Sequence, residues 1–152
     1  LGDSSVHSPS DSFNEGLLLE KESHFFDDFF TLSNNINSWL NKKTVLLNRL
    51  VKEHGKINAK AFPGRSAILI KMLKLDENII SGVFEKHGSL KIGNYVPGTR
   101  IPILSDQDLF SSEDINQPII NLAWHISKEI NSYMVRSGYK GLIIDILSED
   151  DF

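Results

Sequence analysis

The chain of 152 residues contains no cysteine. This absence excludes a disulfide-stabilised scaffold and any zinc site that uses thiolate ligands. The histidines show neither the H-x-x-x-H nor the H-E-x-x-H spacing of local metal motifs, and we therefore expect no metal site. The five are His7, His24, His54, His87 and His125.

Long apolar runs are also missing. No stretch approaches the roughly 20 apolar residues that a membrane-spanning helix needs, and the N-terminus lacks the charged-then-apolar pattern of a signal peptide. We therefore predict no membrane association and a cytoplasmic location.

A strong positive charge is absent as well. The formal net charge is −4, and acidic and basic residues are interspersed along the chain. This balance argues against a nucleic-acid or anionic-membrane surface. The adjacent Lys42 and Lys43 are interpreted as part of a solvated helix face.

The length predicts one domain with a real core. Residues 1–19 begin with a stretch rich in Ser, Asp, Pro and Gly, which predicts a flexible arm or linker before a domain over residues 20–152. Because the first residue is Leu1, we expect a domain excised or processed from a longer polypeptide.

Residues 23–54 predict one long helix, or two helices broken near Asn34-Asn35, followed by Gly55 as a stop. Apolar residues recur there at spacings of three and four. The stripe is interpreted as core, with a dimer or interdomain face as the alternative. Its members are Phe25, Phe26, Phe29, Leu32, Ile36, Trp39, Leu40, Leu46, Leu47, Leu50 and Val51.

Beyond the helix, short apolar runs alternate with helical patterns. Strands are predicted over residues 56–62, 79–84, 101–103, 119–124 and 142–146, and helices over 66–73, from Ser105 in an S-x-x-D capping box, and over 126–136. This alternation predicts an α/β fold: a Rossmann-like, doubly wound, mostly parallel sheet of about five strands with the long N-terminal helix packed on it.

One stretch is dense in residues that restrict the backbone. Residues 91–103, K-I-G-N-Y-V-P-G-T-R-I-P-I, hold two glycines and two prolines between polar side chains. Such a segment positions side chains rather than filling a core. We call it the signature loop.

Together with L-A-W-H-I-S-K-E-I at residues 122–130, the signature loop resembles the C-terminal domain of S-adenosylmethionine-dependent sugar C-methyltransferases. That family shows a K-x-G-x-x-x-P-G-T-x-I-P-I signature, then an apolar strand ending in Trp-Asn and a helix holding Glu-Ile. The resemblance covers roughly residues 20–146.

The resemblance implies partners as well as a fold. In the family, a zinc-binding part and a methyltransferase domain, which binds S-adenosylmethionine through an E/D-x-G-x-G-x-G motif, precede this domain. Neither the motif nor a cysteine occurs here. We therefore expect no cofactor and no catalytic residue in this chain, no methyl transfer by it alone, and a S-adenosylmethionine-binding domain as partner in cis or trans.

Ligands of open α/β sheets sit beyond the carboxyl ends of the strands. The turn at residues 62–66 is the first candidate, where Arg65 and the helix beginning at Ser66 would receive a phosphate. A strand-to-helix turn capped by Ser66 is the alternative. The family's earlier glycine in this turn is replaced by Ala61 or Phe62.

Glu85 is the second candidate, at the end of the second predicted strand and about 20 residues past Gly64, where dinucleotide folds place an acid against ribose hydroxyls. An ordinary solvated glutamate is the alternative. The family has an aspartate five residues before its lysine, whereas Glu85 precedes Lys91 by six residues.

The third candidate is a crevice between the signature loop and the tip of the fourth predicted strand. Tyr95, Thr99 and Arg100 would provide one wall, with Arg100 against a pyrophosphate, and Lys91 of the same loop is a further candidate for substrate binding. Trp124 and His125 would provide the other, with Trp124 stacking on a base or sugar ring or else packing in the core. His125 stands where the family has asparagine, and Glu129 matches the family's glutamate as a tethering carboxylate.

Three functions remain open from the sequence. The first, implied by the resemblance, is binding of a nucleotide-linked sugar for a methyltransferase domain. The second is a non-catalytic interaction module that uses the long helix, with a homodimer as one form. The third is a small independent enzyme in which His125 acts as acid or base with Glu85 or Glu129.

Overall fold

The computed structural model describes residues 15–151, which fall into two compact units divided between Asn37 and Ser38. The first unit holds helix α1 (Glu15–Ser23) and the beginning of helix α2 (Phe25–His54). Residues 1–14 of the predicted arm lie outside the described residues, and residues 15–19 belong to α1.

Helix α2 runs without a break through Asn34 and Asn35, so the single-helix alternative is the one observed. It ends at His54, where Gly55 adopts a φ of 79° and donates its N–H to the Val51 carbonyl at 2.9 Å. A left-handed glycine just past the last turn is a common helix stop, because a side chain there would be strained.

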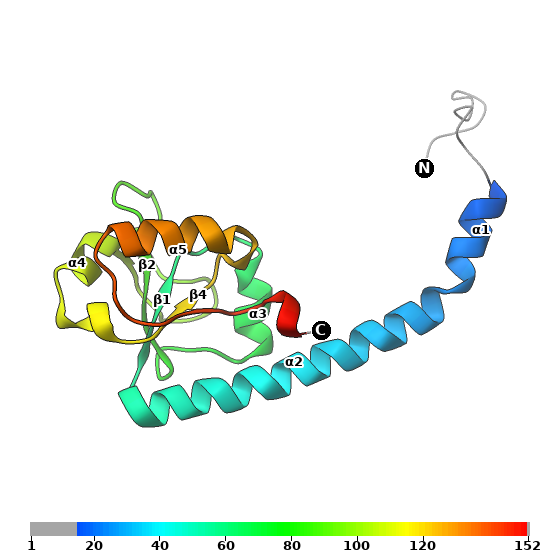
Figure 1. Cartoon of the computed structure of the whole chain (residues 1–152), viewed down its shortest axis with the longest axis horizontal. Helices are drawn as coiled ribbons and strands as arrows, with labels where there is room; N and C mark the ends of the chain where they lie inside the picture. Colours follow the sequence, from blue (N-terminus) through cyan, green and yellow to red (C-terminus); the bar gives the residue numbers. More distant parts are fainter. Residues whose placement is uncertain (1–14, 152) are drawn as a thin grey trace. The chain divides into compact units, whose positions relative to one another are not determined.

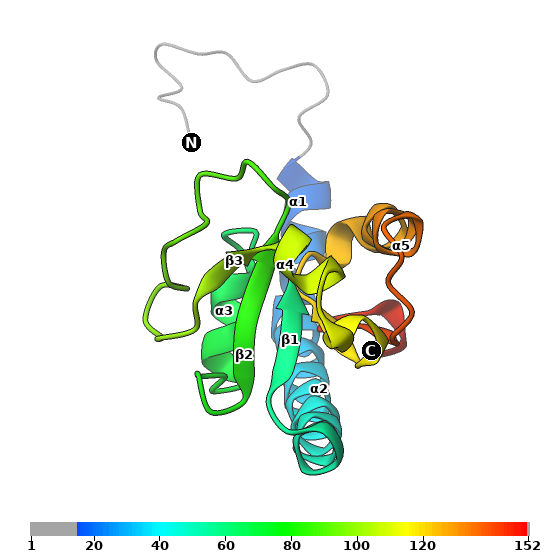
Figure 2. The same ribbon diagram turned by 90° about the vertical axis from the view of Figure 1, so that its left-hand side faces the viewer.

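The second unit is built on five parallel strands: β1 (Ile57–Lys60), β2 (Ile80–Glu85), β3 (Ile103–Ser105), β4 (Ile119–Asn121) and β5 (Ile143–Asp145). Their order across the sheet is β3-β2-β1-β4-β5, and Figure 2 shows β3, β2 and β1 side by side. The predicted α/β class with a five-stranded parallel sheet is confirmed.

The strand order reverses at the centre of the sheet. From β1 the chain adds β2 and then β3 toward one edge, and it then returns to the other side of β1 for β4 and β5. Parallel α/β sheets bind ligands beyond the carboxyl ends of the strands beside such a reversal. A ligand site is therefore expected at the carboxyl ends of β1 and its neighbouring strands.

Helices cover both faces of this sheet. The core on one face joins α2 from Trp39 onward with α3 (Ser66–Met72), and the core on the other joins α4 (Asp106–Phe110) with α5 (Ser127–Arg136). Figure 1 shows α2 and α5 on opposite sides of the strands. The described part of the second unit also contains three short 3₁₀ helices: η1 (Glu113–Asn116), η2 (Trp124–Ile126) and η3 (Glu149–Asp151).

The C-terminal segment is anchored on α2 by polar contacts. Trp39 Nε1 donates to the Ile146 carbonyl at 2.9 Å, and Lys43 Nζ lies 3.0 Å from Asp151 Oδ2 and donates to the Asp145 carbonyl at 3.1 Å. The prediction that Lys43 belongs to a solvated face is wrong, because it falls four residues from Trp39 in the buried stripe. Lys42 is exposed.

The fourth predicted strand is shorter than expected. The fourth strand stops at Asn121 rather than Trp124, because Asn121 Oδ1 accepts the Ala123 N–H at 2.9 Å and turns the chain. At the predicted capping box, Ser105 Oγ does accept the Gln107 N–H at the start of α4.

Within the described residues, none of the helices combines the length and apolarity that a membrane span requires.

Candidate functional site

The turn that follows β1 is held by two of the predicted site residues. Glu85 Oε1 accepts hydrogen bonds from Phe62 N at 2.8 Å and from Lys91 Nζ at 3.0 Å. Lys91 Nζ also donates to the Phe62 carbonyl at 2.6 Å. Glu85 and Lys91 therefore fix both polar groups of the Phe62 backbone, and the ammonium group stays half exposed at the carboxyl end of β1 and β2.

A cavity of about 290 Å³ opens beside this ion pair. We call it the signature crevice, because five of its eight lining residues belong to the signature loop. It combines apolar and aromatic surface with one ammonium group and one side-chain amide. Its lining residues are Phe62, Gly64, Leu90, Lys91, Asn94, Tyr95, Pro97 and Ile103.

The signature loop folds back on itself as a hairpin. Gly93 N donates to the Ile103 carbonyl at 2.9 Å, Ile103 N donates to the Asn94 carbonyl at 2.8 Å, and Val96 N donates to the Ile101 carbonyl at 2.9 Å. The bend falls at Gly98, whose φ is 77°. Residues 98–100 thereby lie near the amino end of β2, where Arg100 meets Glu77, and away from the carboxyl ends of the strands.

The hairpin bend contacts the segment that precedes β2. Arg100 N donates to Glu77 Oε2 at 3.2 Å, and Thr99 Oγ1 donates to the Val96 carbonyl and accepts the Ile101 N–H. Thr99 thus holds the hairpin together, and the Arg100 side chain is exposed.

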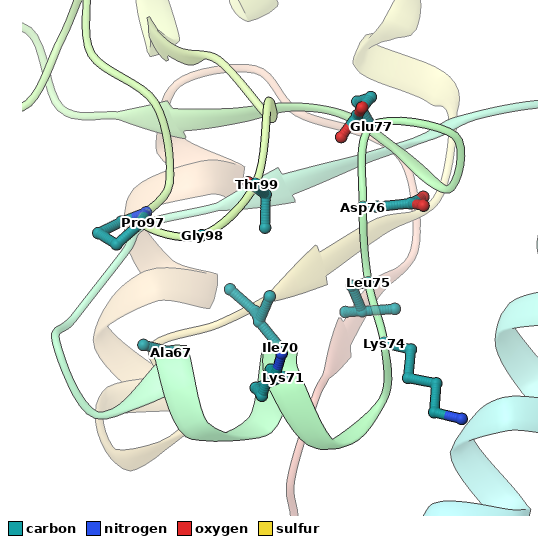
Figure 3. A pocket seen from close by; sticks show the side chains of 10 residues that line it. All are labelled: Ala67, Ile70, Lys71, Lys74, Leu75, Asp76, Glu77, Pro97, Gly98 and Thr99. Atoms are coloured by element: carbon teal, nitrogen blue, oxygen red, sulfur yellow. The ribbon is translucent and has the colours of Figure 1, made fainter.

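A second cavity, of about 520 Å³, lies between this bend and α3 (Figure 3). The side chains of Ile70 and Leu75 project toward the hairpin, and those of Lys74 and Asp76 point away from it. The residues that line this second cavity are Ala67, Ile70, Lys71, Lys74, Leu75, Asp76, Glu77, Pro97, Gly98 and Thr99.

Trp124 and His125 lie elsewhere, in η2 beyond the carboxyl end of β4. Trp124 packs on the α2–α3 core, and its ring meets the His125 ring edge-on with centroids 5.4 Å apart. Because Arg100 is at the amino end of β2, the predicted crevice between Arg100 and Trp124 is not formed. The backward course of the hairpin is the reason.

The remaining predicted residues are placed as follows. Arg65 is exposed at the N-cap of α3, whereas Ser66 is buried and its hydroxyl donates to the Pro63 carbonyl at 2.6 Å rather than capping the helix. Glu129 is exposed on α5. His125 follows β4 and Glu85 ends β2, so β1 separates the two.

The chain matches the model of a protein family, described as the C-methyltransferase C-terminal domain, over residues 3–143. This match covers nearly the whole sequence and includes the signature loop. The chain belongs to this family. A comparison with curated proteins gave no match.

This C-methyltransferase C-terminal domain also contains a buried charged cluster that was not predicted from the sequence. Lys60 Nζ lies 2.9 Å from Asp106 Oδ2, Tyr133 Oη donates to the same oxygen at 2.6 Å, and His87 N donates to Asp106 Oδ1 at 3.1 Å. The exposed fractions of Lys60 and Asp106 are only 2% and 1%. The cluster joins β1, α4, α5 and the beginning of the β2–β3 connection.

The pKa values in this cluster follow from burial and pairing. Burial lowers the pKa of Lys60 despite its contact with Asp106. Burial alone would raise the pKa of Asp106, but the hydrogen bonds from Tyr133 and Lys60 outweigh it and leave that pKa below its ordinary value. Burial and the bond to Asp106 raise the pKa of Tyr133 to about 12.

A second missed network lies at the carboxyl ends of β4 and β5 of the C-methyltransferase C-terminal domain. Asp145 accepts hydrogen bonds from Asn121 Nδ2 and Ser127 Oγ, each at 2.6 Å. These bonds tie both strands to the first turn of α5. The signal in the sequence was a polar residue at the end of a short strand: Lys60 in β1, Asn121 in β4 and Asp145 in β5.

Proposed function

We propose that this domain binds a nucleotide-linked sugar in the signature crevice and packs on a S-adenosylmethionine-binding catalytic domain, in cis or in trans. One observation carries the proposal: the signature-loop residues Lys91, Asn94, Tyr95 and Pro97 line a cavity together with Phe62 and Gly64, which follow the carboxyl end of β1. Ligands of open α/β sheets occupy that position.

The fold supports the same assignment. The order β3-β2-β1-β4-β5 corresponds to the first five strands of the doubly wound dinucleotide-binding sheet, and we propose that the domain, with the later part of α2 on one face, is Rossmann-like in this sense. The domain over residues 20–152 would then be a binding domain that follows a linker.

The chemistry of the crevice suits a ring joined to a phosphate. Tyr95, an exposed residue, offers aromatic surface and a hydroxyl to a base or sugar ring, and the largely buried Phe62 ring also lines the cavity. The Lys91 ammonium is available to a phosphate oxygen at the rim. Arg65 is one residue from Gly64, and we propose it as a second cation for the same phosphate.

The domain would contribute positioning rather than proton or methyl transfer. In the reaction we propose for the whole protein, the catalytic domain would remove a proton beside a ketone of the sugar. S-adenosylmethionine bound there would supply the methyl group to the resulting enolate carbon, and its sulfur would leave as the neutral thioether. Glu85 would act by holding Lys91 and the Phe62 turn. Trp124 and His125 would face the catalytic domain or the far end of the ligand.

Titration calorimetry with a panel of nucleoside diphosphate sugars tests the proposal on the whole chain. We expect saturable binding, weakened about tenfold by Tyr95→Ala, because an aromatic contact and a hydrogen bond together contribute about 1–2 kcal/mol. Arg100→Ala is the matched control, since it removes an exposed side chain of the same loop at the opposite end of the sheet. Absence of binding to every nucleotide-sugar would refute the function, and equal effects of the two variants would refute the site.

A further inference from the structure

The first unit exposes a dense group of large apolar side chains on its helices. Four phenylalanines at the start of α2 are between 47% and 81% exposed, and leucines on both helices accompany them. Exposed aromatic residues at this density usually mark an interaction surface. The residues used in this argument are Leu18, Phe25, Phe26, Phe29, Phe30 and Leu32.

The apolar residues of α2 follow a seven-residue repeat. One row is Phe25, Leu32, Trp39 and Leu46, and a second row, four residues later, is Phe29, Ile36, Lys43 and Leu50. Two such rows, three and four residues apart, form the seam with which one helix packs along another.

The later half of this seam is covered within the second unit. Trp39, Lys43 and Leu50 are buried there against the sheet and the C-terminal segment. In the earlier half, Phe25 and Phe29 form an edge-to-face pair with centroids 5.9 Å apart and remain exposed to solvent. Within the first unit, Phe25 and Phe29 of the two rows are therefore exposed, whereas later members of the rows are buried within the second unit.

We propose that the early part of α2 pairs with the same segment of a second copy of this chain, as a symmetric dimer. A two-row seam fits another helix, and the same seam on a second copy is its self-complementary partner, as two-fold symmetry requires. The sheet and the C-terminal segment already cover the later half of the α2 seam. The proposed dimer contact is therefore confined to residues before Ser38.

The exposed area is of the right size. A phenylalanine side chain offers about 150–250 Å². Phe25 and Phe29 in the rows, together with Phe26 and Phe30 one residue after each of them, therefore present about 500 Å² per copy at these exposures. The leucines bring the total toward the roughly 800 Å² per partner of an ordinary stable interface.

The composition of the segment also requires a partner. Thr31, Ser33 and the asparagines at 34, 35 and 37 are poor helix formers. Helical stability in such a segment comes mainly from packing of its apolar face. A second copy supplies that packing, and the helix and the dimer should therefore form together.

Sedimentation equilibrium of the whole chain, over a wide concentration range, tests this inference. We expect a monomer–dimer equilibrium whose dissociation constant rises at least about a hundredfold in Phe25→Ala/Phe29→Ala, because central aromatic residues dominate interface energies. Alanine is the best helix former, so the variant does not lose its helix through propensity. Val45→Ala is the matched control: Val45 is 70% exposed on the same helix but outside both rows.

Three outcomes would overturn the dimer. These are a monomeric chain at all concentrations, a double variant that associates as the parent does, and an equal loss in Val45→Ala. If the parent stays monomeric and instead binds a separately produced S-adenosylmethionine-binding domain through Phe25 and Phe29, that domain is the occupant. Sugar binding in the signature crevice is unaffected by any of these results.

Discussion

At the scale of single residues, the Lys60–Asp106 pair gives the sharpest prediction. Asp106→Ala would leave the buried Lys60 ammonium and the partly buried Tyr133 hydroxyl without their shared acceptor. Breaking a buried ion pair by removing one partner costs about 3–5 kcal/mol. Urea unfolding should show this loss, whereas Tyr133→Phe, which removes one donor, should cost about 1 kcal/mol. Equal, small effects would contradict the account of the cluster.

The Asp106 carboxylate also makes the stability of the folded chain depend on pH. The pKa of Asp106 is lowered in the folded chain from its ordinary value of 3.8, because the hydrogen bonds from Tyr133 and Lys60 outweigh burial. Its contribution to stability is therefore present above pH 3.8 and is lost as the pH falls through the lower, folded-state pKa. The free energy of unfolding measured between neutral and strongly acidic pH should fall less steeply in Asp106→Asn than in the parent.

The sequence identified some of these residues and not others, for a physical reason. Glu85 and Lys91 were predicted as site residues, and the structure brings them together at the Phe62 turn. Lys60 was missed because a lysine at the end of a strand is ordinarily solvated. Its burial depends on Asp106, which is 46 residues away and pairs with it only in the folded sheet.

At the scale of elements, the signature loop depends on glycine at its bend. Gly98 has a φ of 77°, yet an added Cβ would meet no atom within 4 Å. Gly98→Ala should therefore cost about 1–2 kcal/mol through backbone strain alone. Gly64→Ala is the control, because Gly64 also has open space but no positive φ. Thermal unfolding that does not separate the two variants would show that the bend relaxes without cost.

Element types followed from the sequence more faithfully than their arrangement. The five strands lie within the apolar runs that predicted them or within two residues of them, because period and composition are local properties. The third strand begins at Ile103 rather than Ile101, since the preceding residues pair backward with residues 93–96. That pairing has no local signal, and it separates Arg100 from Trp124.

At the scale of the whole molecule, the strand order depends on long-range contacts. The alternation of strands and helices along the sequence does not determine it. The pattern of strands and helices predicted a parallel sheet. The reversal that places β4 beside β1 depends on contacts such as Leu122 N to the Lys60 carbonyl. The apolar stripe of α2 was interpreted as core, with a dimer or interdomain face as the alternative. Its early phenylalanines are exposed, because periodicity reports an apolar face but not what covers it.

The attachment of the C-terminal segment to α2 provides the last prediction, a double-mutant cycle on Lys43 and Asp151. Asp151→Ala should destabilise the chain more than Lys43→Met, because the first leaves a buried ammonium with only the Asp145 carbonyl as a partner, whereas methionine keeps the apolar stem. The double variant should lose less free energy of unfolding than the two single variants lose together, with a coupling energy of about 1–3 kcal/mol. Strict additivity in urea unfolding would mean that the 3.0 Å contact contributes nothing to holding the end of the chain on the helix.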